Sequence, residues 1–290
     1  MGIQSITGAP CNESGFEATE EMRIQSANEA QPMTLIEKSL QAVAQLGLRR
    51  STYRVTLATS VAEVRAAQAL RFEVFNMELD KGLAQSYDTG LDVDPFDAVC
   101  DHLLVHDVAS DSVVGTYRLQ TGRRAAAGLG YYSEREFDFA PLEAMRGETL
   151  ELGRASIHRD HRSFAVLNLL WRGIGAYARD HGTRYLIGCS SLTSQDPAVG
   201  AAAYRQLAGK HLAPPAWQTQ PNAAFACPLD VLASEPPKVP RLLAAYLALG
   251  AAICGAPAID REFCTIDFLT WNDLECPAMQ AMQRRGRFTA

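Results

Sequence analysis

Charged residues occur inside two stretches whose apolar pattern predicts β-strands. Arg118 lies in the first stretch, and Glu151 and Arg154 lie in the second. Charges are costly in central strands unless they are paired or lead to a functional site. On a regular strand Glu151 and Arg154 point to opposite faces, but Gly153 between them favours a bulge that redirects one side chain. Two interpretations stay open: structural ion pairs, or a polar cleft that splits the sheet, where freed backbone N–H groups face a reacting carbonyl.

A second group of charges lies on and after the first helix expected in the folded part. Arg71 belongs to that helix, Phe75 follows one turn later, and the next loop contains several aspartates. These aspartates are Asp92, Asp94, Asp97 and Asp101. Carboxylates next to arginines suit a zwitterionic substrate such as an amino acid. The alternative is a solvated acidic loop.

The segment 154–184 is basic, although the whole chain is acidic. It carries six arginines and two acids, whereas the chain has 27 Lys+Arg, 33 Asp+Glu and a net charge of −6. A basic surface of this kind favours an anionic partner, and the turn before the helix near Arg162 offers backbone donors to a phosphate. Arg159, Arg162 and Arg172 are therefore candidate docking residues. An ordinary exposed helix face is the alternative.

Several common catalytic motifs are absent from the sequence. It has no G-x-x-x-x-G-K-[ST], G-x-G-x-x-G, G-x-S-x-G or H-E-x-x-H motif, so nucleotide hydrolysis, dinucleotide redox chemistry and zinc proteolysis lose support. The seven cysteines are irregularly spaced without a C-x-x-C pair, which indicates reduced thiols in a cytoplasmic protein. His102 and His106 are interpreted as structural, and no metal site is expected. The acidic balance argues against nucleic-acid binding.

The elements that must position these residues follow from periodicity and capping signals. Strands are expected over residues 53–59, 102–108, 113–120, 149–157 and 185–192. Ser60 and Glu63 form a capping box for a helix over 61–77, and Ser133 with Glu136 marks another short capped segment. A long amphipathic helix is expected over 164–181, between the last two strands. This order predicts a mixed α/β fold.

The ends of the chain differ from this folded part. Residues 1–33 are acidic and poor in large apolar groups, which predicts a disordered tail. We expect an amphipathic helix over 34–50, one folded domain over 51–275 and a basic tail over 276–290. Residues 242–259 carry no charge and predict an apolar helix that is buried or lies at an interface, because its alanines, glycines and proline disfavour a membrane span.

Several separated blocks resemble the bacterial ornithine–acyl-carrier-protein N-acyltransferases, a hemolysin-like family of the GNAT superfamily. The blocks lie at residues 94–104, 114–119, 151–154, 169–174, 246–251 and 260–267. More distantly, the chain is similar to acyl-homoserine-lactone synthases, whose conserved pattern of Arg and Phe, two Asp, a strand Arg and E-x-x-R is matched residue by residue. The matching residues are Arg71, Phe75, Asp94, Asp97, Arg118, Glu151 and Arg154.

The resemblance implies a GNAT-like mixed central sheet flanked by helices, and a specific reaction. A 3-hydroxy fatty acyl group would move from the phosphopantetheine arm of acyl carrier protein to the α-amino group of L-ornithine, which gives lyso-ornithine lipid. No cofactor would be bound by the protein itself. CoA is a doubtful donor, because HRSFA at 161–165 replaces the glycine-rich pyrophosphate loop of acetyl-CoA-type GNAT enzymes.

The resemblance also implies roles for the matched residues. Glu151 is the first candidate for the base that deprotonates the amine, and backbone N–H groups near Gly153 and Arg154 are candidates for holding the oxyanion. Arg71, Phe75, Asp94, Asp97 and Arg118 are the candidate substrate-binding residues. One of their acids would meet the side-chain ammonium of ornithine, and no covalent acyl-enzyme is expected.

Two alternatives to this function stay open. The first keeps the donor and changes the acceptor to glycine, another amino acid or a homoserine-lactone precursor. The second is a non-catalytic protein that binds lipid at the inner membrane surface through residues 34–48 and 242–259. A peripheral membrane contact of 242–259 is also compatible with the enzyme.

Overall fold

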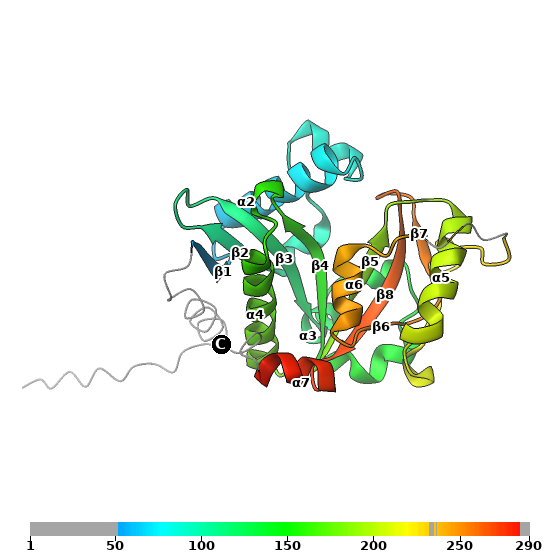
Figure 1. Cartoon of the computed structure of the whole chain (residues 1–290). Helices are drawn as coiled ribbons and strands as arrows, with labels where there is room; N and C mark the ends of the chain where they lie inside the picture. The colour runs from blue at the N-terminus through cyan, green and yellow to red at the C-terminus, as the bar shows by residue number, and fades with distance from the viewer. Residues whose placement is uncertain (1–51, 232–234, 236, 285–290) are drawn as a thin grey trace, which may run out of the picture. The chain divides into compact units, whose positions relative to one another are not determined.

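A mixed sheet of eight strands runs through the part of the chain that the computed structural model describes, residues 52–231, 235 and 237–284 (Figure 1). The strands are β1 (Tyr53–Leu57), β2 (Asp101–Asp107), β3 (Val113–Thr121), β4 (Thr149–Ile157), β5 (Tyr185–Leu192), β6 (Ala252–Ile253), β7 (Ala258–Asp260) and β8 (Thr265–Asp273). Their order is β1-β2-β3-β4-β5-β8-β6, with β7 also paired to β8. All pairings are antiparallel except that of β4 with β5. The expected mixed α/β fold is confirmed.

Helices cover both faces of the sheet. They are α2 (Val61–Phe72), α3 (Gly122–Ala127), α4 (Phe164–Asp180), α5 (Pro197–His211), α6 (Arg241–Ala248) and α7 (Pro277–Arg284). The α4 helix connects β4 to β5 and buries Leu170 and Ile174 against Val55 and Leu103 of the sheet. The α2 helix begins at the predicted Ser60 capping box, packs against β2–β4 and continues as a π-helical turn over Glu73–Glu78.

Short 3-10 turns complete the described part. They are η2 (Ala84–Asp88), η3 (Pro95–Ala98), η4 (Tyr132–Arg135), η5 (Ala140–Glu148), η6 (Arg159–His161) and η7 (Pro215–Trp217). The predicted cap of Ser133 by Glu136 is wrong. Glu134 accepts from the Tyr131 N–H instead, because the N–H and hydroxyl of Ser133 are bonded to Glu151.

The parallel strands β4 and β5 pair along only a short part of their length. Residues 149–151 pair with residues 185–187, and the pairing stops there although β4 continues to Ile157 and β5 to Leu192. The backbones remain close where they diverge, since a Cβ on Gly188 would lie 2.3 Å from the carbonyl oxygen of Leu152. The expected split in the sheet is therefore present.

The register between β3 and β4 shifts at a bulge. Gly153 pairs with Arg118 and Ser156 pairs with Thr116, so that Arg154 and Ala155 together lie opposite one residue of β3. The predicted bulge is confirmed, but the residue with left-handed backbone is Arg154, with φ of 52°. A non-glycine residue in this conformation costs about 1–3 kcal/mol, so surrounding contacts must hold it.

The apolar segment 242–259 is not one helix, contrary to our expectation. Its helix ends at Ala248, Gly250 has a positive φ of 90°, and the short strands β6 and β7 follow. Residues 253–260 are buried in the protein, so this part of the segment is covered and cannot rest on a membrane. None of the helices within the described residues combines the length and hydropathy that crossing a bilayer requires.

The remaining predictions at the chain ends have mixed outcomes. The tail over 1–33 and the helix over 34–50 lie outside the described residues. The segment 276–290, expected as a basic tail, contains the helix α7, and its last six residues lie outside the described part.

Candidate active site

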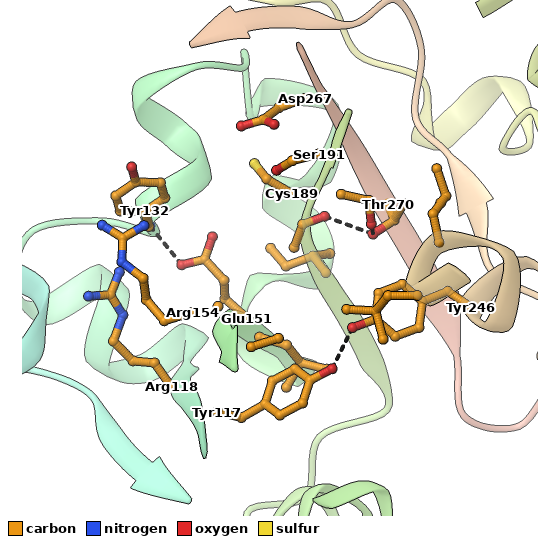
Figure 2. A pocket seen from close by; sticks show the side chains of 18 of the residues that line it. Tyr117, Arg118, Tyr132, Glu151, Arg154, Cys189, Ser191, Tyr246, Asp267 and Thr270 are labelled. Carbon is orange, nitrogen blue, oxygen red and sulfur yellow. Dashed lines mark hydrogen bonds between the residues drawn. The ribbon is translucent and has the colours of Figure 1, made fainter. Parts of the chain in front are cut away.

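A cavity of about 290 Å³ occupies the split between β4 and β5 (Figure 2). Neighbouring residues of β5 such as Ser190 and Ser191 line it, and since side chains alternate along a strand, the cavity reaches both faces of the sheet. Its mostly apolar walls, on the side of α4 and α6, include Tyr117, Leu152, Trp171, Leu243 and Tyr246. Its polar walls, on the opposite side, include Glu151, Arg154, Cys189, Asp260 and Asp267. A molecule with a long apolar chain and a charged head matches this division.

Glu151 lies on β4 at the point where the two parallel strands separate. One carboxylate oxygen accepts from the Ser133 N–H at 2.9 Å and the Ser133 hydroxyl at 2.5 Å, and the other accepts from the Tyr132 N–H at 2.7 Å. Burial raises the pKa of Glu151, although these hydrogen bonds and Arg118 act in the opposite direction. A carboxylate has about four acceptor positions, so about one remains for a donor that enters the cavity. A buried carboxylate with an acceptor position left at a cavity is compatible with accepting a proton from a bound group.

Three arginines and three aspartates form a charge-balanced network behind Glu151. They are Arg71, Arg118, Arg154, Asp92, Asp94 and Asp97. Arg71 contacts Asp92 and Asp97 at 2.8 Å each, and Arg118 and Arg154 contact Asp94 at 2.6 and 2.7 Å. No side chain of the six is more than 9% exposed. Burial alone would raise the pKa of Asp97, but Arg71 and Arg118 outweigh it and hold that pKa well below its usual range.

The network determines where Arg154 points. Its guanidinium lies 4.2 Å from the ring centroid of Phe263 and 4.9 Å from that of Tyr132, within cation–π distance of both. These ring contacts and the ion pairs of Arg154 with Asp92 and Asp94, at 3.3 and 2.7 Å, stabilise the left-handed backbone at the bulge. Arg154 and Glu151 consequently lie on the same, polar side of the cavity, although a regular strand would place them on opposite faces (Figure 2).

The structure divides the predicted substrate-binding residues into two groups. Phe75 and Arg118 line the cavity, and Phe75 makes an edge-to-face contact with Phe263. Arg71, Asp94 and Asp97 lie behind the cavity wall, where their charges are engaged with one another. The geometry of these three residues supports a positioning role rather than substrate contact.

The predicted docking residues lie outside the cavity. Arg159 is exposed on η6, and Arg172 is partly buried in α4. Arg162 is also exposed, but it donates to Glu78 at 2.5 and 2.6 Å and to the carbonyl oxygen of Ile157 at 3.1 Å. Arg159 and Arg162 thus lie at the turn before α4, where Arg162 is paired with Glu78, and Arg172 lies farther along the helix.

Sequence reasoning missed a group of acids at the polar end of the cavity. Asp260 and Asp267 come from the paired strands β7 and β8, Glu136 comes from a distant segment after η4, and each is buried. Cys189 lies beside them, and burial followed by the charges of Glu136 and Asp267 raises the pKa of its thiol, which makes it a poor nucleophile. Ligand atoms of Cys189, Glu136 and Asp267 lie within 4.8 Å of one another, close enough for a cation to bridge them. Only the block 260–267, noted for its resemblance, pointed to part of this group.

Comparison with known proteins finds a family model and several similar proteins. Residues 70–172 match the family model of the acetyltransferase (GNAT) domain. The chain is 33% identical over 249 residues to L-ornithine N(alpha)-acyltransferase of Rhodobacter capsulatus, covering 81% of this chain and 93% of that protein. It is 35% identical over 235 residues to the protein of the same name in Brucella abortus, covering 76% and 83%. The solved structure of the AHL synthase LasI covers 80% of this chain and 94% of its own, at 12% identity and a TM-score of 0.46.

Proposed function

The chain belongs to the family of L-ornithine N(alpha)-acyltransferases, and we propose that it moves a 3-hydroxy fatty acyl group from acyl carrier protein to the α-amino group of L-ornithine. One observation supports this most directly: Glu151, a buried acid at the split of the sheet, belongs to the polar wall of a cavity whose other wall is apolar. The apolar walls suit the acyl chain and the polar walls suit an amino acid.

The chemistry assigned to Glu151 begins with the α-ammonium of the acceptor. Glu151 takes one proton from it, and the neutral amine attacks the thioester carbonyl carbon. The tetrahedral intermediate collapses as the C–S bond breaks, and the second nitrogen proton passes to the departing phosphopantetheine thiolate. An amide and a free thiol result. General-base assistance of this kind contributes about 10²–10⁴-fold.

The bulge at Arg154 supports the assignment of an oxyanion site. Beyond residue 151 the edge of β4 that faces β5 is unpaired, and Gly153 and Arg154 line the cavity there. Backbone N–H groups at this place would be held rigidly by the Arg–Asp network. An oxyanion donor contributes about 3–4 kcal/mol to the lowering of the barrier.

The apolar end of the cavity supports a fatty acyl donor. Tyr117 and Tyr246 meet there through their hydroxyls at 2.5 Å, and Trp171 packs edge to face on Tyr246 with centroids 5.4 Å apart. Leu243 of α6 completes this wall. These residues would surround the acyl chain.

The arginines at the turn before α4 and on α4 support a carrier protein as the source of the acyl group. Arg159, Arg162 and Arg172 would contact the acidic carrier, whose phosphopantetheine arm ends in the reacting thioester. One phosphate on this arm needs fewer backbone donors than the pyrophosphate of CoA. The segment 161–165 lacks the glycine-rich turn that a pyrophosphate requires.

Thiol release by the full chain tests this function. Acylated carrier protein and the matching acyl-CoA are supplied as donors, with L-ornithine, glycine and homoserine lactone as acceptors, and products are identified by mass spectrometry. We expect thiol release with the carrier donor and L-ornithine, and a product acylated on the α-nitrogen. Preference for another amine would refute L-ornithine as the acceptor. Equal use of acyl-CoA would refute acyl carrier protein as the specific donor. Vesicle binding without thiol release would favour the lipid-binding alternative.

A further inference from the structure

The carboxylates of Glu136, Asp260 and Asp267, called the acidic cluster below, form one end of the catalytic cavity. They are only 2%, 4% and 4% exposed, and Asp260 and Asp267 line the cavity directly. In Figure 2 Asp267 lies beyond Cys189 and Ser191, at the polar end that Glu151 also faces. The Cys189 thiol is 4.0 Å from a carboxylate oxygen of Glu136.

The acidic cluster differs from the Arg–Asp network because it lacks a basic partner. Within residues 52–231, 235 and 237–284, no ion pair joins Glu136, Asp260 or Asp267 to an arginine, lysine or histidine. The nearby Arg135 pairs instead with Glu262 at 3.2 Å. Buried carboxylates without a counter-charge are costly, so their presence at a cavity wall points to a cationic ligand.

Individual oxygen atoms of the cluster locate the open position. One oxygen of Asp260 accepts from the N–H groups of Glu262 and Phe263 at 2.8 and 3.1 Å, which anchors this side chain. By contrast, Oδ1 of Asp267 is buried and has no hydrogen-bond partner among the described residues. Asp267 lines the cavity, so this oxygen is an acceptor without a partner at the cavity wall.

The pKa values of the cluster agree with its lack of a counter-charge. Burial and then the Asp267 charge raise the pKa of Glu136 to about 10, and burial raises the pKa of Asp267 to about 6. Burial and the repulsion between these carboxylates therefore favour a shared proton over two adjacent charges. An entering cation would replace that proton.

We propose that the acidic cluster binds the side-chain ammonium of a diamino acid acceptor, with Asp267 in direct contact and Glu136 and Asp260 completing the site. This inference rests on the proposed function and assigns the specificity of that same site. All four carboxylates, those of Glu151 and of the cluster, raise the pKa of the Cys189 thiol, so they surround one small region. A diamino acid can place its α-ammonium at Glu151 and its second ammonium at the cluster, which orients the reacting nitrogen.

This assignment replaces our expectation that Asp94 or Asp97 meets the second ammonium. Both aspartates are engaged by arginines behind the cavity wall. Acceptors without a side-chain cation, such as glycine, would leave the acidic cluster uncompensated.

The test compares L-ornithine with norvaline, which has the same carbon chain without the terminal amine. For the wild-type chain kcat/KM should favour ornithine by about 10–10²-fold, the value of a charge-assisted hydrogen bond. Asp267→Asn should reduce kcat/KM for ornithine at least about tenfold and change that for norvaline less than about threefold. The matched control is Glu143→Gln, an exposed carboxylate outside the cavity, which should leave the ratio unchanged.

Several outcomes would overturn the proposal. In one, Asp267→Asn and Glu136→Gln each reduce kcat/KM equally for ornithine and norvaline while keeping a native circular dichroism spectrum. That result would indicate a structural role only. Tightly bound metal in the purified chain, whose removal by EDTA abolishes ornithine selectivity, would indicate a metal site instead.

Calorimetry separates this proposal from the proposed function. Ornithine binding, measured in two buffers of different ionisation enthalpy, should release protons from the wild-type chain and fewer from Asp267→Asn. If the wild-type chain acylates no diamino acid but shows this difference, the proposed function fails and the ammonium site stands. If ornithine is acylated and the two chains bind it alike, only the ammonium site fails.

Discussion

Replacing Glu151 with glutamine removes the proposed base with the smallest change of shape. The glutamine oxygen can still accept from the Ser133 N–H and hydroxyl. Its NH2 group, however, would face the Tyr132 N–H, because that donor now bonds to the second carboxylate oxygen at 2.7 Å. The variant therefore loses one buried hydrogen bond as well as the base.

The lost hydrogen bond and the lost base affect different quantities, by different amounts. The Tyr132 N–H, left without an acceptor, should lower the free energy of unfolding by about 1–3 kcal/mol. Loss of the base should lower the single-turnover rate of acyl transfer by about 10²–10⁴-fold, which corresponds to about 3–5 kcal/mol of barrier. Urea unfolding and rapid-quench thiol release measure these quantities separately.

Ser133→Ala is the matched control for Glu151→Gln. It removes the 2.5 Å bond from the hydroxyl but keeps the carboxylate. That hydroxyl lowers the pKa of Glu151, so its loss should raise the pKa further. Because the base must be deprotonated, the fall of kcat/KM at acidic pH should move to higher pH in Ser133→Ala. In Glu151→Gln this limb should disappear.

One result would refute the reasoning about Glu151. If Glu151→Gln transfers the acyl group within about threefold of the wild-type rate, Glu151 is not the base. The same conclusion follows if the acidic limb of the pH profile is unchanged in that variant.

Three other variants test the surroundings of the site. Asp97→Asn leaves the fully buried Arg71 short of a partner and should lower the free energy of unfolding by about 3–5 kcal/mol, against less than about 1 kcal/mol for the exposed Asp111→Asn. Since the native pKa of Asp97 is lowered, its contribution to stability is present above pH ~4 and is lost as the pH falls through the native pKa. The free energies of unfolding of the wild-type chain and Asp97→Asn should therefore converge on acidification. A difference that does not change with pH would contradict this. Gly188→Ala places a Cβ 2.3 Å from the Leu152 carbonyl oxygen and should lower the melting temperature. Its control, Gly209→Ala in α5, has open space around the new Cβ and should raise the free energy of unfolding by about 0.5–1 kcal/mol. Equal melting temperatures of the two variants would disprove the close approach at Gly188. Arg159→Glu should raise KM for the acylated carrier protein at low salt without lowering kcat, and an unchanged KM would exclude this surface from docking.

Much of the sheet could be predicted because its signals are local. Alternating apolar residues and polar turns define β4 and β5 at their observed bounds, and the Ser60 capping box marks the start of α2. Helix α5 escaped prediction because its alanines and glycines give little periodicity. The end of α6 was missed because an uncharged run does not show where pairing with β8 begins.

The candidate site was only partly predictable because its contacts are tertiary. Charges inside strands indicated Glu151, Arg118 and Arg154, and a glycine indicated the bulge. The left-handed residue is nevertheless Arg154, since ion pairs and ring contacts from other segments stabilise a conformation that arginine seldom adopts alone. The acidic cluster joins Glu136 to Asp260 and Asp267, more than a hundred positions later, and no spacing rule connects them.

The short ladder between β4 and β5 has a mechanical consequence. Three residue pairs join β1–β4 to the other strands there, whereas eight pairs join β5 to β8. Because few backbone pairs cross this junction, we expect the sheet to open first along it. Local opening along it should precede global unfolding, so the amides of residues 185–187 that bond across this line should exchange with deuterium before those that bond to β8. Local opening between β4 and β5 would let a bulky lipid-like product leave the cavity sideways, between the two strands.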